Sequence, residues 1–445
     1  MPNPLWCLPF AALLTAIAVL PLLPKVSHWW EHHHNKLATS LILGGVVVGY
    51  YGLRGYGLSV EGHTTASGWP TVAAVVKHAV ADDYAPFVIL LFSLYTIAGG
   101  LHLRGSIPPR PVVNTAILAL GAVLASLIGT TGASMLLIVP LLDANRSRSR
   151  MTHTVVFFIF LVSNFGGLLT PLGDPPLFLG YLQGVPFTWT LGLWRPWLVG
   201  CGLVLSIYYV WERVAFAREP SVQPVALGPL ELRGAINLLW LVGVVLSVAF
   251  LVPGRAIPGT DRVTPNFARE AVMLALVGLS IATTPRGLKD DSGFTYGAMI
   301  EVACLFLGVF LTMRVPIEIL QTRGASLGLT TPGQFFWTCG ALSGILDNAP
   351  TYMVFFETAR SLPPGGHAVL PLGGGTAIRQ DLLAAVSCGS VFMGAASYIG
   401  NGPNLMVKSI AEARGVKMPG FFGYIVISGV VLVPVYTLIW WQFFS

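Results

Sequence analysis

Two stretches rich in glycine and proline interrupt apolar runs that are long enough to cross a membrane. The first, S-N-F-G-G-L-L-T-P-L-G-D-P-P-L, runs from Ser163 to Leu177, and the second, S-Y-I-G-N-G-P-N-L, runs from Ser397 to Leu405. Glycine and proline destabilise a helix interior, so each run is predicted to be a helix that breaks near its middle. Irregular backbone persists at membrane depth only where protein buries it or where it lines a watery cavity. Paired breaks therefore indicate the binding site of a transporter.

The composition is that of an integral membrane protein. The 445 residues are 54% hydrophobic and only 10% charged, whereas roughly a quarter of the residues in soluble domains are charged. The net charge of +6 comes from Lys and Arg residues scattered through short loops. This scatter is typical of residues that orient a membrane protein, and it argues against a nucleic-acid partner. The five cysteines show no CxxC spacing and are interpreted as small core residues.

Two further apolar runs are interpreted as re-entrant hairpins. Val112 to Leu142 is longer than the roughly 20 residues that a span needs, and G-T-T-G-A-S weakens the helix at its centre. A hairpin that turns there places the flanking arginines on one membrane face, as the positive-inside rule requires. These arginines are Arg104, Arg110, Arg146, Arg148 and Arg150. The run from Phe335 to Arg360, broken by L-D-N-A-P-T, is interpreted as a second hairpin that enters from the opposite side.

The predicted fold class is an all-α integral membrane protein with about ten transmembrane helices plus two re-entrant hairpins, arranged as an inverted-topology repeat with two broken helices. N-terminal helices are expected in residues 1–84 and a first transport repeat in residues 85–211. A cytoplasmic linker is expected in residues 212–234. A second transport repeat with its preceding helices is expected in residues 235–445, and both chain ends are expected outside.

The two halves of the chain align with each other. T-G-A-S-M-L-L aligns with A-P-T-Y-M-V-F, which places Met135 opposite Met353. G-D-P-P-L aligns with N-G-P-N-L, which places Pro175 opposite Pro403. Corresponding helices are predicted to cross in opposite senses, and repeats of this kind hold their substrate and ions near the bilayer midplane.

These motifs resemble the ion transporter superfamily, which includes NhaD-type sodium/proton antiporters, citrate and dicarboxylate carriers of the CitMHS type, and arsenite efflux pumps. The resemblance covers roughly Phe87 to Trp211 and Met299 to Ile410 and is specific for the superfamily more than for a substrate. It implies a multi-pass protein of the bacterial inner membrane. It also implies a homodimer in which each subunit has a scaffold domain and a moving transport domain.

The candidate binding residues are polar side chains at the hairpin tips and helix breaks. Their hydroxyl, amide and carboxylate oxygens suit a hard cation such as Na⁺. Asp174 and Asp347 are the candidate Na⁺ ligands, because a carboxylate at membrane depth is costly and can alternate between a proton and a cation. Each aspartate could instead only cap the helix that follows it. The full set is Thr130, Thr131, Ser134, Ser163, Asn164, Thr170, Asp174, Asp347, Asn348, Ser397, Asn401 and Asn404.

The leading functional prediction is a sodium(lithium)/proton antiporter in which protons displace the cation from Asp174 and Asp347. A sodium- or proton-coupled citrate/dicarboxylate transporter and an arsenite-type efflux pathway are the alternatives. The charge of Asp174 disfavours a bare carboxylate substrate, but a metal-complexed or Na⁺-paired anion remains open. No P-loop, nucleophile elbow or HExxH motif predicts an enzyme. No cofactor is expected beyond Na⁺ and H⁺ as transported or coupling ions, and the expected partners are a small ion or molecule and the lipid bilayer.

Overall fold

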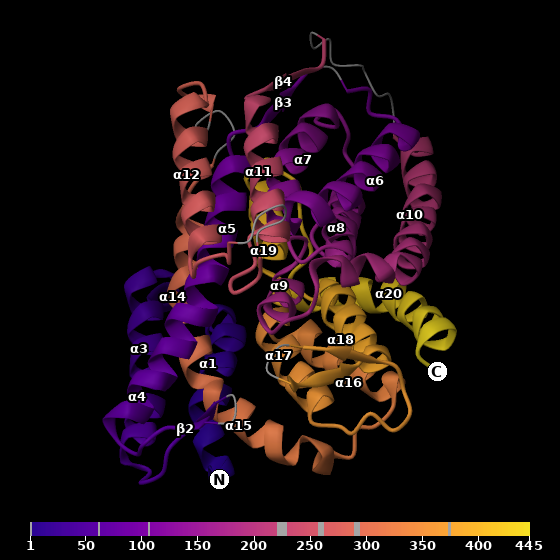
Figure 1. Ribbon diagram of the computed structural model, residues 1–445. Helices are drawn as coiled ribbons and strands as arrows, with labels where there is room; N and C mark the ends of the chain where they lie inside the picture. The colour runs from indigo at the N-terminus through magenta and orange to yellow at the C-terminus, as the bar shows by residue number, and fades with distance from the viewer. Residues whose placement is uncertain are drawn as a thin grey trace.

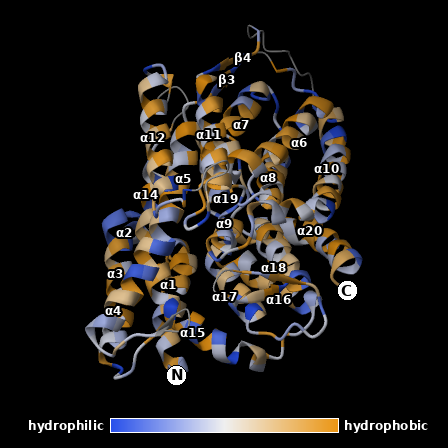
Figure 2. Ribbon diagram, viewed as in Figure 1, coloured by the Kyte–Doolittle hydropathy of each residue, from blue (hydrophilic) through white to orange (hydrophobic). Residues whose placement is uncertain are grey.

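The computed structural model describes residues 2–60, 63–105, 107–219, 229–256, 262–288, 294–372 and 375–445. In this part of the chain, seven helices are long and apolar enough to cross a membrane, and an eighth span results if the bent pair Gly297–Thr312 and Arg314–Leu327 counts as one. Apolar residues cover the helices on their outward as well as their inward faces (Figure 2). The predicted class, an all-α integral membrane protein, is confirmed.

The elements of the first half lead to a long helix and then to the first hairpin and the first broken helix (Figure 1). They are η1 (Pro4–Cys7), α1 (Leu8–Val19), η2 (Leu20–Leu22), α2 (Ser27–Glu31), α3 (His33–Leu53), α4 (Trp69–Val76), η3 (Lys77–Tyr84), α5 (Ala85–Ala98), α6 (Pro111–Ile128), α7 (Thr130–Ala144), α8 (Thr152–Leu161), η4 (Phe165–Leu169), α9 (Pro175–Leu182), η5 (Phe187–Leu193) and α10 (Trp194–Ala217).

The second half has the same order of elements. They are α11 (Ile236–Phe250), α12 (Ala268–Thr283), α14 (Gly297–Thr312), α15 (Arg314–Arg323), η6 (Gly324–Leu327), α16 (Pro332–Ile345), α17 (Asn348–Arg360), α18 (Gln380–Met393), η8 (Gly394–Ala396), α19 (Gly402–Ala413) and α20 (Phe421–Phe443). The strands of the described residues form three short antiparallel pairs, β1 (Ser59–Val60) with β2 (His63–Thr64), β3 (His102–Arg104) with β4 (Glu231–Arg233), and β5 (Val369–Pro371) with β6 (Ala377–Arg379).

Helices α6 and α7 form the first predicted hairpin. Gly129 connects them with φ 82°, a conformation that glycine adopts without a steric penalty. At the far end of the pair, the side chains of Asn114 and Asn145 exchange two hydrogen bonds of 3.0 and 2.9 Å. Both outer ends of the pair therefore lie on one side, and the predicted hairpin is confirmed.

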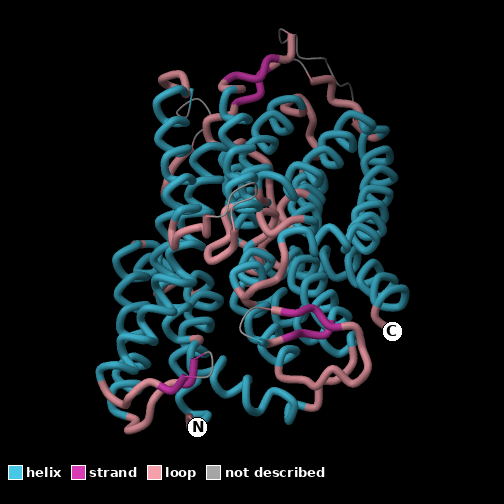
Figure 3. Tube along the Cα trace, viewed as in Figure 1, coloured by secondary structure: helices cyan, strands magenta, loops and turns pink. Residues whose placement is uncertain are grey.

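Helices α16 and α17 form the second hairpin. A capping box between Thr331 and Gln334 begins α16. The rings of Phe335 in the first turn of α16 and Phe355 in α17 lie 6.3 Å apart, which brings the outer parts of the two helices together. The first hairpin lies above and the second below the broken segments in Figure 1, and these segments form loops at the centre of the helical body in Figure 3.

The helix starts define how the two halves correspond. Met135 and Met353 each lie six residues after an N-cap, Gly129 in α7 and Asp347 in α17, so their predicted equivalence is confirmed. The second predicted pairing is wrong by one residue. The N-caps of α9 and α19 are Asp174 and Asn401, which places Pro176 and not Pro175 opposite Pro403. The N-cap, and not a nearby proline, defines where each half-helix begins.

The repeat extends to helices that precede the transport segments. In the first half α1 and α3 pack on α14, where Gly308 lies against Ser40. In the second half α11 and α12 pack on α5, where Asn237 Nδ2 donates to the Gly100 carbonyl at 3.0 Å and Ser280 Oγ donates to Asn237 Oδ1 at 2.6 Å. The pair α1 and α3 of the first half therefore packs on α14 of the second half, and the pair α11 and α12 of the second half packs on α5 of the first half.

The connection between the halves returns to the side of the first hairpin's outer ends. Strand β4 pairs with β3, and Glu219 accepts hydrogen bonds from the amides of Ser149 and Arg150 at 3.2 and 2.8 Å. Helix α10 continues to Ala217, so the first residues of the predicted 212–234 linker are helical. Residues 220–228 of that linker lie outside the described residues.

Candidate functional site

Asp174 lies where both hairpins and both broken helices meet. It is 1% exposed. Its Oδ1 accepts hydrogen bonds from Thr130 Oγ1 at 3.1 Å and Asn401 Nδ2 at 2.8 Å, and its Oδ2 accepts one from Asn348 Nδ2 at 2.6 Å. Three donors around one carboxylate suit its ionised form, which only accepts hydrogen bonds. The two halves of the chain therefore share one buried acid.

The four residues of this cluster lie at the N-terminal ends of four half-helices. Thr130 and Asn348 are the first residues of α7 and α17, and Asp174 and Asn401 are the N-caps of α9 and α19. Each helix N-terminus carries a partial positive charge of about half a proton and has unpaired amide groups. Ends of this kind attract an anion, and here the Asp174 carboxylate is a tethered anion among them.

Capping alone explains Asp347 but not Asp174. Asp347 Oδ1 accepts a hydrogen bond from the Ala349 amide at 3.0 Å, which is an N-cap interaction. Asp174 has the extended backbone of an N-cap, with φ −142° and ψ 143°, but its side chain makes no capping hydrogen bond. Its carboxylate instead joins α9 to α7, α17 and the start of α19.

Four more of the predicted residues form a polar layer behind Asp174. The hydroxyls of Ser134 and Ser163 lie 2.9 Å apart. Asn164 Nδ2 donates to Asn404 Oδ1 at 2.8 Å, and Asn401 Nδ2 donates to the Ser163 carbonyl at 2.9 Å. Asn164 Oδ1 is buried and has no hydrogen-bond partner among the described residues. This oxygen is suited to a bound cation.

The last three predicted residues do not contact Asp174 through a hydrogen bond of the described side chains. Thr170 Oγ1 donates to the Ser126 carbonyl, and Ser397 Oγ accepts from the Gly400 amide at 3.2 Å. Both interactions stabilise the bends of the broken helices. Thr131 lines the cavity next to the tip of the first hairpin.

A cavity of about 480 Å³ adjoins the cluster. Thr130, Asp347 and Asn401 contribute to its wall at one end, and Ile410 near the end of α19 contributes at the other. The end of α19 lies beside the end of α7, because Arg414 Nε is 3.8 Å from Asp143 Oδ1. The cavity therefore extends from the hairpin tips toward the outer ends of the first hairpin. This side, where Arg146, Arg148 and Arg150 follow α7, is called the arginine-rich side.

The charged residues in the described wall of this cavity are both acidic. Asp347 is one of them, and Glu301 is the other. Glu301 forms an ion pair with Lys36, whose Nζ lies 2.6 Å from Glu301 Oε1. Lys36 itself is not in the wall, so a ligand in the cavity does not meet a lysine or arginine among the described lining residues.

One bend residue was not predicted from the sequence. Ser126 Oγ donates to the Gly166 carbonyl and accepts from the Leu169 amide at 3.1 Å, and the Ser126 carbonyl accepts from Thr170. These contacts join α6 to the first broken helix. A single serine in an apolar helix gives little local signal for such a role.

A charged cluster at the base of the first hairpin was also not predicted. Glu212 is fully buried in α10 and accepts hydrogen bonds from Asn114 Nδ2 at 2.8 Å and Arg148 Nη2 at 3.0 Å. His153 Nε2 lies 2.7 Å from Glu212 Oε2. Glu212 therefore connects α6, the loop after α7, and α8. The sequence feature that could have indicated the cluster is a glutamate near the end of an apolar helix. A glutamate at that position is equally compatible with the start of a solvent-exposed loop.

Residues 2–444 match the family described as "Putative citrate transport". The chain belongs to this family. The match spans almost the whole sequence, and no curated protein matches the chain significantly. The predicted membership of the ion transporter superfamily is thereby confirmed, and the protein is a multi-pass membrane transporter. A citrate transport family agrees better with the citrate alternative than with sodium/proton antiport.

Proposed function

We propose that this protein is a cation-coupled secondary transporter of citrate or a closely related carboxylate. The observation that carries the proposal is the convergence of four helix N-termini on one buried acid, Asp174. Amide-rich helix ends bind carboxylates, and the family match supports citrate as the carboxylate.

The acid in this site makes a cation necessary. A bare citrate with several negative charges would approach Asp174 and Asp347 without a lysine or arginine among the described lining residues. Neutralisation removes this repulsion in one of two ways. A metal ion or Na⁺ accompanies the citrate, or Asp174 takes up a proton.

The remaining features of the proposal rest on the resemblance to the ion transporter superfamily and on the arginines that flank the first hairpin. The hairpins and broken helices would move together as a transport domain against the helices packed on α5 and α14. The protein would form homodimers in a bacterial inner membrane, and the cavity would open to the cytoplasm.

Labelled citrate uptake into proteoliposomes tests the proposal. We expect accumulation when Mg²⁺ or Na⁺ is present or when a proton gradient is imposed, and little uptake without either. Asp174→Asn should remove this dependence. A complete lack of citrate, succinate and malate uptake under all of these conditions, with the protein folded, would refute the proposal.

Sodium/proton antiport is the second candidate, because the charged residues in the described cavity wall are acidic and Asn164 Oδ1 is buried without a partner among the described residues. The same proteoliposomes distinguish the two functions. Added Na⁺ or Li⁺ that dissipates a pH gradient without any carboxylate present would support antiport. Dissipation that requires citrate would support the symport proposed above.

A further inference from the structure

A second hollow lies on the arginine-rich side, away from Asp174. It has a volume of about 340 Å³ and is bounded by α8, α10, α20 and the loop before α8. The lining residues are Ser149, Arg150, Thr152, His153, Val156, Phe157, Trp211, Ala215 and Ile427. Its floor is therefore mainly apolar, and a cationic side chain stands at one end.

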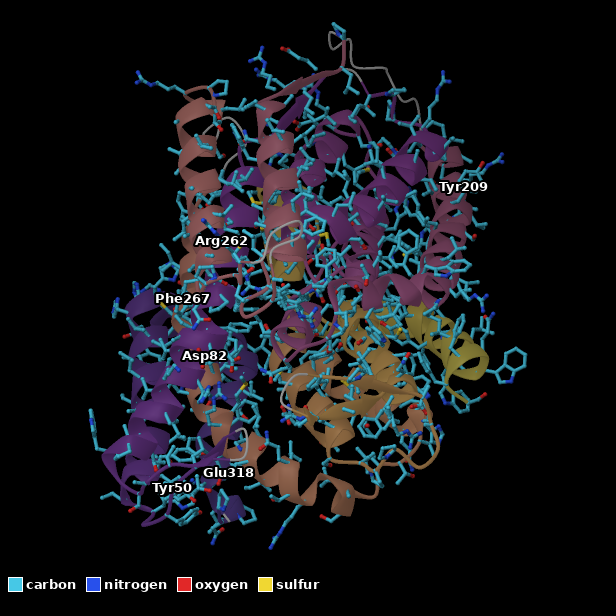
Figure 4. All side chains as sticks on the ribbon, in the orientation of Figure 1. Tyr50, Asp82, Tyr209, Arg262, Phe267 and Glu318 are labelled. Atoms are coloured by element: carbon cyan, nitrogen blue, oxygen red, sulfur yellow. The ribbon has the colours of Figure 1, made fainter. Side chains whose placement is uncertain are left out.

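The helices on both sides of this groove present apolar surfaces to the outside. On α10, Val210 and Val214 are 64% and 47% exposed, and on α20, Val426 is 65% exposed. Tyr209, on the same stretch of α10, lies at the outer edge of the helical body and is partly exposed (Figure 4). Surfaces of this kind face lipid in a membrane transporter, and Trp211 is a residue type enriched at the membrane interface. The groove thus opens toward lipid near the arginine-rich surface.

The charge at the end of the groove is available to a ligand. The Arg150 side chain is exposed and has no ion pair or hydrogen bond within the described part of the chain. The nearby acids already have partners. Glu219 accepts from the Ser149 hydroxyl at 2.8 Å and from the Arg150 amide at 2.8 Å, and Glu212 is bonded to Arg148.

The backbone of Lys417 lies next to the groove. Thr152 Oγ1 donates to the carbonyl of Lys417 at 2.9 Å, and the Lys417 side chain is exposed. An exposed arginine at one end of an apolar groove complements a molecule with an anionic head and a hydrocarbon tail. A soluble anion such as phosphate would leave the apolar floor without a partner.

We propose that this groove binds an anionic phospholipid, with its phosphate at Arg150 and an acyl chain along Trp211 and Ile427. Basic pockets between transmembrane helices on the cytoplasmic side are suited to such headgroups. The proposal is independent of the transported substrate.

The groove floor connects the lipid to the first hairpin. The rings of His153 and Trp211 are stacked, with centroids 6.2 Å apart and planes 6° from parallel. His153 also contacts Glu212, which binds Asn114 at the start of α6. A bound lipid covers this stack and thereby stabilises the base of the hairpin.

Native mass spectrometry of the full-length protein tests the site. The protein is equilibrated in detergent with phosphatidylglycerol and phosphatidylcholine that have identical acyl chains. We expect preferential retention of one phosphatidylglycerol, and about fivefold weaker retention in Arg150→Ala, because one arginine near the surface contributes about a factor of five. Arg146→Ala is the matched control, since Arg146 is exposed on the same loop but does not line the groove. It should retain the lipid as the wild type does.

A second variant tests the apolar part. Ala215→Phe fills the groove and should lower retention of both lipids, with the melting temperature of the protein confirming that it is folded. Equal retention of the two lipids by the wild type would overturn the proposal. An Arg146→Ala effect as large as that of Arg150→Ala, or displacement of the lipid by inorganic phosphate alone, would also overturn it.

Discussion

Asp174→Asn tests whether the buried carboxylate competes with an anionic substrate for the four helix N-termini. The substitution keeps the size of the side chain and removes its charge. If a substrate carboxylate binds about 6 Å from the Asp174 carboxylate, the two unit charges repel by about 3 kcal/mol at an effective dielectric constant of 20. This energy corresponds to about a hundredfold change in affinity. We therefore expect metal-free citrate to bind about a hundredfold more tightly to the variant than to the wild type.

The substitution also has a structural cost. The introduced amide would present an NH₂ group to a cluster in which Thr130, Asn348 and Asn401 all donate to Asp174. One donor would lose its acceptor, which costs about 1–3 kcal/mol of unfolding free energy. Isothermal titration calorimetry of the purified protein with citrate, over a series of Mg²⁺ and Na⁺ concentrations and pH values, measures the affinity. Thermal unfolding of the same samples measures the structural cost.

Asp347→Asn is the matched control for the structural cost. Asn caps a helix about as well as Asp, so the stability of α17 should hardly change. Asp347 lines the cavity and is the second acid that a bare citrate would meet, so Asp347→Asn should also raise the affinity for metal-free citrate, without the lost hydrogen-bond acceptor of Asp174→Asn. If Asp174→Asn is folded and its citrate affinity keeps the wild-type dependence on cations and pH, the carboxylate does not couple cation to substrate.

Three other substitutions test the parts that support the site. Glu212→Gln leaves Glu219, whose Oε1 is 3.9 Å from Arg148 Nε, as the remaining anionic partner of the buried Arg148. We therefore expect the unfolding free energy to fall by about 3 kcal/mol, the lower end of the range for a broken buried ion pair, measured as a lower melting temperature in detergent. Gly173→Ala places a methyl group against the backbone of the first broken helix and should abolish transport in proteoliposomes. Burial of Glu219 opposes its ionisation, but hydrogen bonds from the Ser149 hydroxyl and two loop amides, with the Arg148 charge, outweigh burial and lower the pKa of Glu219. Because its folded pKa lies below the unfolded one, its stabilisation is present above about pH 4.3 and is lost as the pH falls through the folded pKa. Glu219→Gln should therefore lower the melting temperature at pH 7 and have no effect in acid.

Each of these substitutions has a control substitution at a position where little effect is expected. Gly202→Ala is the control for Gly173→Ala, because an added Cβ at Gly202 has no atom of the described residues within 4 Å and Gly202 is not among the described lining residues of the cavity. It should transport normally, and a loss equal to that of Gly173→Ala would contradict the packing argument. Glu231→Gln is the control for both glutamates, since Glu231 is an exposed surface residue. A melting temperature of Glu212→Gln that matches that of Glu231→Gln would contradict the assigned role of Glu212.

The breaks and hairpins could be predicted because their signals are local. Glycine and proline in an apolar run break a helix wherever the rest of the chain lies, and the arginines around the first hairpin place both of its ends on one side. The start of each half-helix was less certain, because Pro175 and Pro176 are both compatible with a helix start. The structure resolves this choice through the N-cap conformation of Asp174.

The partners of Asp174 could be predicted only as a set of candidates. The inverted repeat indicates that both hairpin tips approach the midplane, and Thr130, Asn348 and Asn401 were among the predicted residues. Their sequence positions do not show which atoms meet, because those contacts join residues far apart in the chain. The Glu212 cluster was missed for the same reason, since its partners come from three other segments.

The pseudo-twofold relation of the halves explains why a single acid has such influence on this site. The N-cap Asp174 is equivalent to the neutral Asn401, and the tip residues Thr130 and Asn348 are equivalent and neutral. A fully neutral version of this arrangement would offer four helix N-termini to a substrate anion. The change from amide to carboxylate at one of two equivalent positions places there a group that is negatively charged unless it takes up a proton. Under the proposed function, each transport cycle with an anionic substrate would require at least one positive charge, and the asymmetry between the halves would be the basis of cation coupling.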